Sequence, residues 1–240
     1  LFFAFSAASY AADSAPKTNH SNPAPKKEFT PVLPSTEQPN QKVIRDSGGV
    51  STSYLIKSAP VSGDFVMGNP KAPLMMVEYA SMACPHCAHF SGVVMPEIEK
   101  KYVQTGKMRY ILRQFPLNEP ALKAAMLLDC VGSQNQEKYY VFARVMFDAQ
   151  SKWAFDGNYL SGLETIAMVG GLSKGQFENC LNNTDREMRI LKIKKLATEE
   201  LKVPHTPYIF IGGEVYSGDH SVQAVSTFID AKLAQLTEKQ

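Results

Sequence analysis

The pattern of hydrophobic and polar residues divides the chain into an apolar start, a polar stretch and a long region with regular periodicity. Residues 1–11 are apolar and end in small residues, whereas residues 12–50 are rich in Pro, Ser, Asn and Lys. A segment of that second composition cannot bury enough surface to offset the entropy lost on ordering. We therefore expect residues 12–50 to form a disordered linker and residues 51–240 to form the folded domain.

Two segments predict the central strands of a sheet. Residues 74–80 are almost entirely apolar, and strands of this kind are usually buried on both faces. Residues 108–115 are predicted to form a second buried strand. The segment between them, residues 85–103, has helical periodicity, with Pro96 expected to kink the helix. A strand, a helix and a strand with short connections predict a βαβ unit with parallel strands.

The second half of the domain predicts a helical insertion followed by a hairpin and a final helix. Helical periodicity extends over about 118–203, and residues 208–211 and 214–216 flank a Gly-Gly turn that favours a β-hairpin. The apolar residues of the last segment recur on one helical face: Val222, Val225, Ile229, Leu233 and Leu236. The predicted order is βαβ, a block of helices, and ββα, which is an α/β architecture.

Composition limits the function classes. The 240 residues are 44% hydrophobic and 20% charged, which suits one globular domain with a sizeable core. The formal net charge is only +2, so no polybasic surface argues for nucleic acid or an anionic membrane. The four cysteines are too few for a disulfide-built scaffold, so their positions matter more than their number.

Two of the cysteines form the motif Cys84-Pro85-His86-Cys87, directly after the first apolar strand and at the start of the helix. Free backbone N–H groups at a helix start stabilise a thiolate, which lowers a cysteine pKa from about 8.5 to about 3.5–7.5. We therefore expect Cys84 to be the attacking sulfur and Cys87, one turn on, to be the resolving sulfur. Pro85 suits the first helical turn, and His86 can add a positive charge near the Cys84 sulfur.

Other uses of a Cys-x-x-Cys motif can be weighed by spacing. Attachment of c-type haem requires a histidine directly after the second cysteine, and Ala88 occupies that position. Zinc could use both cysteines with His86 or His89, but structural zinc usually draws a second ligand pair from elsewhere in the chain, and none is evident. A structural local disulfide is a third alternative. We expect redox function, with no metal and no cofactor.

The run Val-Glu-Tyr-Ala-Ser-Met-Ala-Cys-Pro-His-Cys at 77–87, with the insertion and a later Thr206-Pro207, resembles the DsbA-like periplasmic thiol:disulfide oxidoreductases of the thioredoxin superfamily. The resemblance covers about residue 53 to the C-terminus. It implies a thioredoxin fold, in which βαβ and ββα units flank the helical subdomain. It also implies donation of the Cys84–Cys87 disulfide to newly secreted thiol-containing proteins, and reoxidation by a membrane quinone-linked partner.

The resemblance assigns roles to two residues before the hairpin. Pro207 is expected to follow a cis peptide bond facing Cys84, although only about 5–6% of X-Pro bonds in folded proteins are cis. Thr206 is expected to offer backbone hydrogen bonds to an extended substrate segment. Thr at this position is seen in isomerase-type relatives, whereas many strong oxidases have Val, so the direction of net catalysis stays open.

Glu78 is the one charged residue in its apolar strand. A buried carboxylate costs several kcal/mol unless it is paired or protonated, which suggests a use. The resemblance implies a buried acid that relays a proton to or from the resolving Cys87. The alternative is a carboxylate that points to solvent at a strand end.

The other two cysteines, Cys130 and Cys180, lie in separate predicted helices of the insertion. An exported protein meets an oxidising compartment, so we expect a structural disulfide between them. Two inert, buried thiols are the alternative. On the entropic model, a loop of about fifty residues closed by this bond would stabilise the fold by about 4 kcal/mol.

Residues 1–11 look like the end of a signal peptide, which predicts a periplasmic or secreted protein. A membrane-anchored form is the alternative, because upstream residues could lengthen the apolar segment. We expect a monomer with no nucleic-acid partner. Two function hypotheses compete with the oxidase: a disulfide isomerase or reductase of the same fold, and a non-catalytic peptide-binding or surface-antigen protein on a thioredoxin scaffold.

Overall fold

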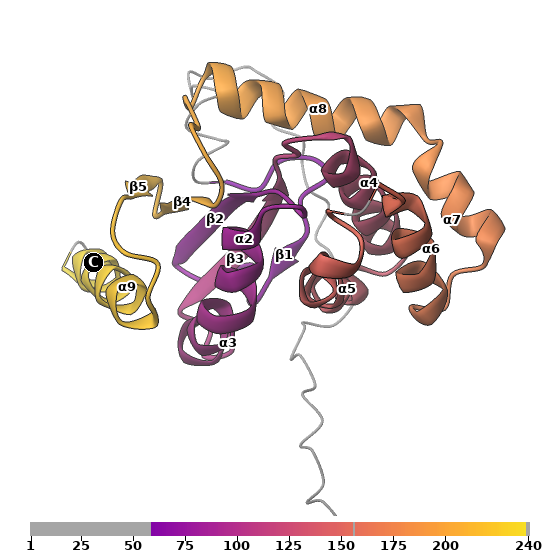
Figure 1. Cartoon of the computed structure of the whole chain (residues 1–240). Coiled ribbons are helices and arrows are strands. Elements are labelled where there is room, and N and C mark those ends of the chain that lie inside the picture. Colours follow the sequence, from indigo (N-terminus) through magenta and orange to yellow (C-terminus); the bar gives the residue numbers. More distant parts are fainter. Residues whose placement is uncertain (1–58, 156, 239–240) are drawn as a thin grey trace, which may run out of the picture. The chain divides into compact units, whose positions relative to one another are not determined.

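The computed structural model describes residues 59–155 and 157–238, which form a five-stranded mixed sheet with helices around it (Figure 1). The expected signal segment and linker, residues 1–11 and 12–50, lie outside the described residues. The strand order is β1-β3-β2-β4-β5, in which β2 and β3 are parallel and the other neighbours are antiparallel. The strands are β1 Val66–Met67, β2 Leu74–Ala80, β3 Met108–Gln114, β4 Tyr208–Ile211 and β5 Glu214–Tyr216.

Strand β2 lies at the centre of this sheet, with all seven residues buried, as its continuous apolar character predicts. Because successive side chains point to opposite faces, Met76, Glu78 and Ala80 share one face of the sheet and Met75, Val77 and Tyr79 the other. Met76 and Ala80 pack in one hydrophobic cluster with the helices after β2, and Met75, Val77 and Tyr79 pack in a second cluster. Glu78 therefore faces the side of the sheet that carries the cysteine motif.

The segment 85–103 is helical, as predicted, but it is not one kinked α-helix. It consists of α2 (Pro85–His89), a π-helical segment η1 (Phe90–Val94), α3 (Met95–Ile98) and a second π-helical segment η2 (Glu99–Val103). The Met95 N–H donates to the Phe90 carbonyl, five residues back. Pro96 has no N–H to donate, and the wider turn directly before it keeps the helical path continuous.

The insertion between β3 and β4 is helical throughout most of its length, and four of its helices begin where a polar side chain caps them. Asn118, Asn135, Ser173 and Asn183 each accept a hydrogen bond from a first-turn backbone N–H. The helices are α4 Glu119–Gln134, α5 Gln136–Asp148, the 3₁₀ turn η3 Gln150–Lys152, α6 Tyr159–Val169, α7 Lys174–Leu181 and α8 Thr184–Glu199.

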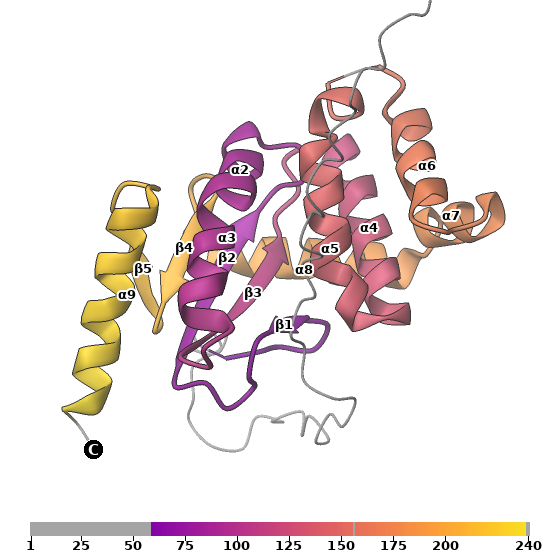
Figure 2. The same cartoon turned by 90° about the horizontal axis from the view of Figure 1, so that it is seen from below.

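The two faces of the sheet are covered by different helices (Figure 2). The helix after β2 and the C-terminal helix α9 (Val222–Thr237) pack on the face that carries Met76, with Val225 and Ile229 fully buried. Helix α8 covers the opposite face through Ala197. Helices α4 to α7 lie beside the sheet, beyond its β1 edge (Figure 2). No helix of the described residues is long and apolar enough to cross a membrane.

Candidate active site

The cysteine motif lies at the carboxyl end of the central strand. β2 ends at Ala80, and a turn closed by the bond from Cys84 N–H to the Ser81 carbonyl leads to Cys84, which is the N-cap of α2. Pro85 occupies the first helical turn, where its missing N–H costs nothing. Both cysteines are thiols, and Cys84 keeps 6% of its surface exposed whereas Cys87 has none. Only the first sulfur is therefore open to another molecule.

Hydrogen bonds lower the pKa of Cys84 from 9.0 to about 5. The largest effect is the hydrogen bond from the Cys87 thiol, and burial acts against it. Thr206 and the backbone N–H groups of Cys87 and His86 add further stabilisation of the thiolate. At neutral pH Cys84 is thus an anion and a ready nucleophile and leaving group.

The pKa of Cys87 moves in the opposite direction. Burial raises it well above its ordinary value, and the hydrogen bond to Cys84 and the charges of Glu78 and Cys84 raise it further. Cys87 therefore stays protonated at neutral pH unless a nearby base removes its proton. The two sulfurs therefore differ in charge, because hydrogen-bond donors surround Cys84 whereas Cys87 is buried away from water.

Thr206 and Pro207 lie against the first sulfur. The Thr206–Pro207 peptide bond is cis, as the resemblance predicts. The Cys84 sulfur lies 3.4 Å from the Thr206 carbonyl oxygen, to which it donates a hydrogen bond when it is protonated. The Thr206 hydroxyl oxygen is buried and has no hydrogen-bond partner among the described residues. This hydroxyl can turn its proton toward a Cys84 thiolate.

Glu78 is buried, with 1% of its surface exposed, as expected, and the alternative of a carboxylate that points to solvent at a strand end does not hold. Desolvation raises the pKa of Glu78 from 4.5 to about 7, a hydrogen bond from the Tyr110 hydroxyl lowers it, and the charge of Cys84 raises it. An acid with such a pKa can give or take a proton at neutral pH.

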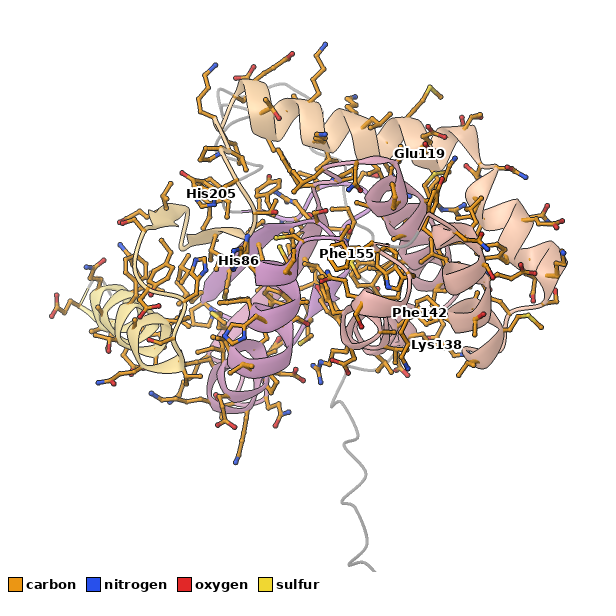
Figure 3. All side chains as sticks on the ribbon, viewed as in Figure 1. His86, Glu119, Lys138, Phe142, Phe155 and His205 are labelled. Carbon is orange, nitrogen blue, oxygen red and sulfur yellow. A yellow bond between two sulfur atoms is a disulfide. The ribbon has the colours of Figure 1, made fainter. Side chains whose placement is uncertain are left out.

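The histidines near the motif are on the outside. His86, in the first turn of α2, and His205, two residues before Pro207, are both exposed (Figure 3). Phe90 lies about one helical turn after His86. The His220 ring packs edge-on against the Phe90 ring, with 5.5 Å between the ring centroids. Burial lowers the pKa of His220, and the charges of His205 and His86 lower it further. These rings border the surface through which Cys84 is reached.

Gln150, in η3 of the insertion, holds the active-site loop from the side. Its side-chain amide donates to the Met82 carbonyl at 2.7 Å and to the Cys84 carbonyl at 3.1 Å, and the residue is buried. The inserted helices therefore help to set the path of the chain that carries Cys84.

Comparison with known proteins identifies the family. A family model described as Thioredoxin matches residues 61–231. The chain belongs to the thioredoxin family. A Rickettsia felis relative that is named as a protein-disulfide oxidoreductase is 31% identical over 206 residues, which cover 86% of this chain and 70% of the relative. Within the family, the crystal structure of Wolbachia pipientis α-DsbA1 is 34% identical with a TM-score of 0.73, and the match covers 78% of this chain and 99% of that one.

The family relationship supports thiol-disulfide exchange as the activity of this chain. Disulfide bond formation protein D of Bacillus subtilis is a more distant relative, 21% identical over 81% of this chain and 86% of its own length. The chain spans 62% to 70% of the length of the first four Rickettsia relatives. The resemblance to DsbA-like enzymes and the thioredoxin fold with inserted helices, both expected from the sequence, are confirmed.

Cys130 of α4 and Cys180 of α7 are joined by a disulfide within this family fold. The bond lies next to a buried ionic cluster, in which Asp129 accepts hydrogen bonds from Arg186 and Arg189 of α8. The arrangement ties α7 and α8 to α4. Among the described residues, no group of three His, Cys, Asp or Glu side chains is arranged to hold a metal ion.

Sequence reasoning missed two residues of this site. Gln150 was not singled out, because nothing local marks one glutamine in a helical region as a partner of a loop 66 residues away. Tyr110 is one aromatic residue within a predicted strand, and nothing local distinguishes it. Its hydroxyl reaches Glu78 only through the register of β2 with β3, which a single sequence does not specify.

Proposed function

We propose that this protein is an oxidase that donates the Cys84–Cys87 disulfide to thiol-containing substrate proteins. The observation that carries the proposal is the contrast between the two sulfurs. The pKa of Cys84 is lowered to about 5, while that of Cys87 is raised. A stabilised Cys84 thiolate stabilises the reduced enzyme, and a protein whose reduced form is stabilised is a strong oxidant.

The magnitude can be obtained from the ionisation of Cys84. The pKa of Cys84 is about 5, so pH 7 lies about two units above it and the thiol is almost entirely ionised. This stabilises the reduced form by about 3 kcal/mol relative to an unshifted thiol. For a two-electron couple that difference is about 60 mV. The site therefore favours release of its disulfide to substrates.

In the proposed reaction, a substrate thiolate attacks the Cys84 sulfur, and the Cys84–Cys87 bond breaks with its electron pair on Cys87. A second substrate thiolate then attacks the substrate sulfur of the mixed disulfide. The substrate disulfide forms, and Cys84 leaves as the stabilised thiolate. Two substrate thiols are oxidised and the enzyme disulfide is reduced, so the electrons balance.

Four residues would assist Cys84 in this reaction. The backbone of Thr206, placed by the cis Pro207, would pair with an extended substrate segment next to the sulfur. His86 would add positive charge beside the thiolate, and Pro85 would keep the helix start in place without using an N–H.

Glu78 would supply the proton that Cys87 needs. Cys87 leaves as a thiolate in a dry environment, where a charge is costly. The Glu78 carboxyl group lies close enough for its negative charge, when it is ionised, to raise the pKa of Cys87, and for the charge of Cys84 to raise the pKa of Glu78. Transfer of its proton would neutralise Cys87 and drive the first step forward.

The proposed location, substrates and reoxidising partner rest on the family resemblance and on the N-terminal sequence. Residues 1–11 would direct the chain out of the cytoplasm, and residues 12–50 would form a linker to the domain that begins near residue 51. The substrates would be proteins exported with free thiols. A quinone-linked membrane protein would reoxidise the enzyme.

The reduction potential tests the proposal. Purified protein is equilibrated with graded mixtures of reduced and oxidised glutathione, and the fraction of Cys84–Cys87 disulfide is measured by mass spectrometry after acid quenching. We expect a potential well above that of thioredoxin, about −270 mV. A value as low as thioredoxin's would contradict the oxidase and favour the reductase. In cells that depend on this protein, full function of a Cys84→Ser variant would instead favour a peptide-binding role.

A further inference from the structure

The Glu78 carboxyl group has one strong hydrogen bond, and it comes from a neutral side chain. The Tyr110 hydroxyl donates to Glu78 Oε2 over 2.5 Å, and both residues are buried. No salt bridge reaches Glu78 from the residues that the structure describes, although buried carboxylates are usually paired with a cation. A phenol therefore occupies the position where a charged partner would be expected.

The register of the sheet brings the two residues together. Tyr110 of β3 pairs with Met76 of β2, and Glu78 pairs with Leu112, so Tyr110 and Glu78 are diagonal neighbours on one face. A tyrosine side chain is long enough to bridge this diagonal. The Tyr110 ring is held in turn by Tyr140 of α5, whose ring centroid lies 5.6 Å away. Tyr110 is thus fixed from two sides.

The titratable groups around Glu78 come from the neighbouring strand, from one helix of the insertion and from the cysteine motif. β3 supplies Tyr110, α5 supplies Tyr140, and the active-site turn and α2 supply Cys84 and Cys87. The pKa values of both tyrosines are raised well above their ordinary value by burial, so both stay neutral. Among these groups, the charge that acts on Glu78 is that of Cys84, which raises the pKa of Glu78.

Two effects on Glu78 therefore oppose each other. Burial favours the protonated acid, and the Tyr110 hydrogen bond favours the carboxylate. With burial alone, Glu78 would hold its proton throughout the neutral range. It could then protonate the Cys87 thiolate, but it could not accept a proton from the Cys87 thiol when the enzyme is reoxidised.

We propose that Tyr110 is a positioning residue that holds the Glu78 carboxyl group beside the cysteine pair and keeps it able to accept, as well as donate, the Cys87 proton. This inference rests on the proton transfer proposed for Glu78 above. Because the Tyr110 hydroxyl occupies Oε2, the proton is exchanged through the other carboxyl oxygen, Oε1. Tyr110 itself exchanges no proton with the sulfurs.

The step that depends on Tyr110 is the resolution of a mixed disulfide during reoxidation. Cys84 has by then attacked an oxidised partner and carries it as a mixed disulfide. The Cys87 proton passes to the Glu78 carboxylate, and the Cys87 sulfur attacks the Cys84 sulfur. The Cys84–Cys87 bond forms, and the partner sulfur leaves with the electron pair of the broken bond. The reverse step returns the proton from Glu78 to Cys87.

A Tyr110→Phe variant tests this role with oxidised glutathione as the partner. Reduced protein is mixed with oxidised glutathione, acid-quenched at set times, and the glutathione adduct and intramolecular disulfide are counted by mass spectrometry. We expect resolution to slow about tenfold at pH 7, with its pH midpoint higher by about one unit. Formation of the adduct by Cys84 is expected to stay within about twofold of the unmodified protein, since that step needs no proton transfer from Cys87.

Tyr139→Phe is the matched control. The Tyr139 hydroxyl is also buried, but it donates to the Leu112 carbonyl and accepts from Gln114 and does not contact Glu78. It should leave the pH midpoint of resolution unchanged. An unchanged midpoint in Tyr110→Phe, or an equal shift in both variants, would overturn the inference, since a general loss of packing would then account for the effect.

Glu78→Gln separates the two proposals. If the rate of resolution no longer depends on pH in Glu78→Gln but keeps its midpoint in Tyr110→Phe, only the proposed role of Tyr110 is contradicted. If Glu78→Gln keeps the pH profile of the unmodified protein, the proton transfer by Glu78 is contradicted, and the role of Tyr110 with it. Should Tyr110→Phe not fold, 3-fluorotyrosine placed at position 110 keeps the ring and strengthens the hydroxyl as a donor. It is expected to move the midpoint downward, and a midpoint that stays or rises overturns the inference.

Discussion

Cys84 and Glu78 lie on one side of the sheet, and their pKa values are shifted in opposite directions for different physical reasons. Cys84 lies at a helix start and receives hydrogen bonds from Cys87 and from backbone N–H groups, so its anion is favoured. Glu78 is buried in the central strand, where desolvation outweighs its hydrogen bond from Tyr110. As a result, both groups titrate at or below neutral pH, and both are suited to exchange chemistry there.

A Glu78→Gln variant should be more stable than the unmodified protein at pH 8 but not at pH 5. The pKa of Glu78 is raised to about 7 in the folded protein. The stability linked to its protonated form is complete below pH 4.5 and is lost as the pH rises through about 7. Glutamine avoids that loss, which is on the order of 3 kcal/mol above pH 8. Urea unfolding of the reduced proteins at both pH values measures the difference, and a pH-independent difference would contradict the assignment.

At the scale of elements, the inserted helices contact both the sheet and the loop that carries Cys84. η3 carries Gln150 to the active-site loop, and α8 covers the face of the sheet opposite the cysteines. The Cys130–Cys180 disulfide and the Asp129 cluster hold α4, α7 and α8 as one unit. The loop with Cys84 is therefore held between the sheet and the insertion.

Replacing Gln150 by Met should destabilise the protein and loosen the active-site loop. The change keeps the length of the side chain but leaves the Met82 and Cys84 carbonyls without their donor. Loss of a partner for buried acceptors costs about 1–3 kcal/mol. Urea unfolding measures the stability, and amide hydrogen exchange over residues 82–87 measures the loop. Gln223→Met, on the exposed side of α9, is the control and should change neither. Equal exchange rates in both variants would show that Gln150 does not hold the loop.

At the scale of the whole molecule, the site is assembled from distant parts of the chain. Cys84 meets Thr206, which is 122 residues away, and Gln150, which is 66 residues away. The environment that stabilises the Cys84 thiolate therefore exists only in the folded protein. By thermodynamic linkage, ionisation of Cys84 must stabilise the fold.

Reduction of the Cys84–Cys87 disulfide should consequently stabilise the protein. The pKa of Cys84 is lowered from 9.0 to about 5 on folding. The resulting stability is complete above pH 9, amounts to about 3 kcal/mol at pH 7, and is lost as the pH falls through about 5. Urea unfolding of the reduced and oxidised forms, with Cys130–Cys180 intact in both, should show the reduced form to be more stable at pH 7. The advantage should disappear near pH 4.5. An oxidised form of equal stability at pH 7 would argue against the proposed oxidase.

The sequence by itself determined the features that depend on neighbouring residues. A continuous apolar segment marked β2, and the hairpin pattern around a Gly-Gly turn marked β4 and β5. Helical periodicity marked the insertion and α9, and the spacing of Cys84 and Cys87 marked the redox motif. The strand β1 was missed because a two-residue strand is too short to show any periodicity. The π-helical segments were missed because they depend on hydrogen-bond registers that periodicity does not report.

The tertiary structure decided which distant groups meet. The pairing of Met76 with Tyr110 places a phenol on Glu78, and the packing of the insertion places Gln150 on the active-site loop. Burial also decided that Glu78 faces the core and that Cys87 keeps its proton. These features depend on strand register and on how elements pack, because desolvation and hydrogen bonding act between groups that only the folded chain brings together.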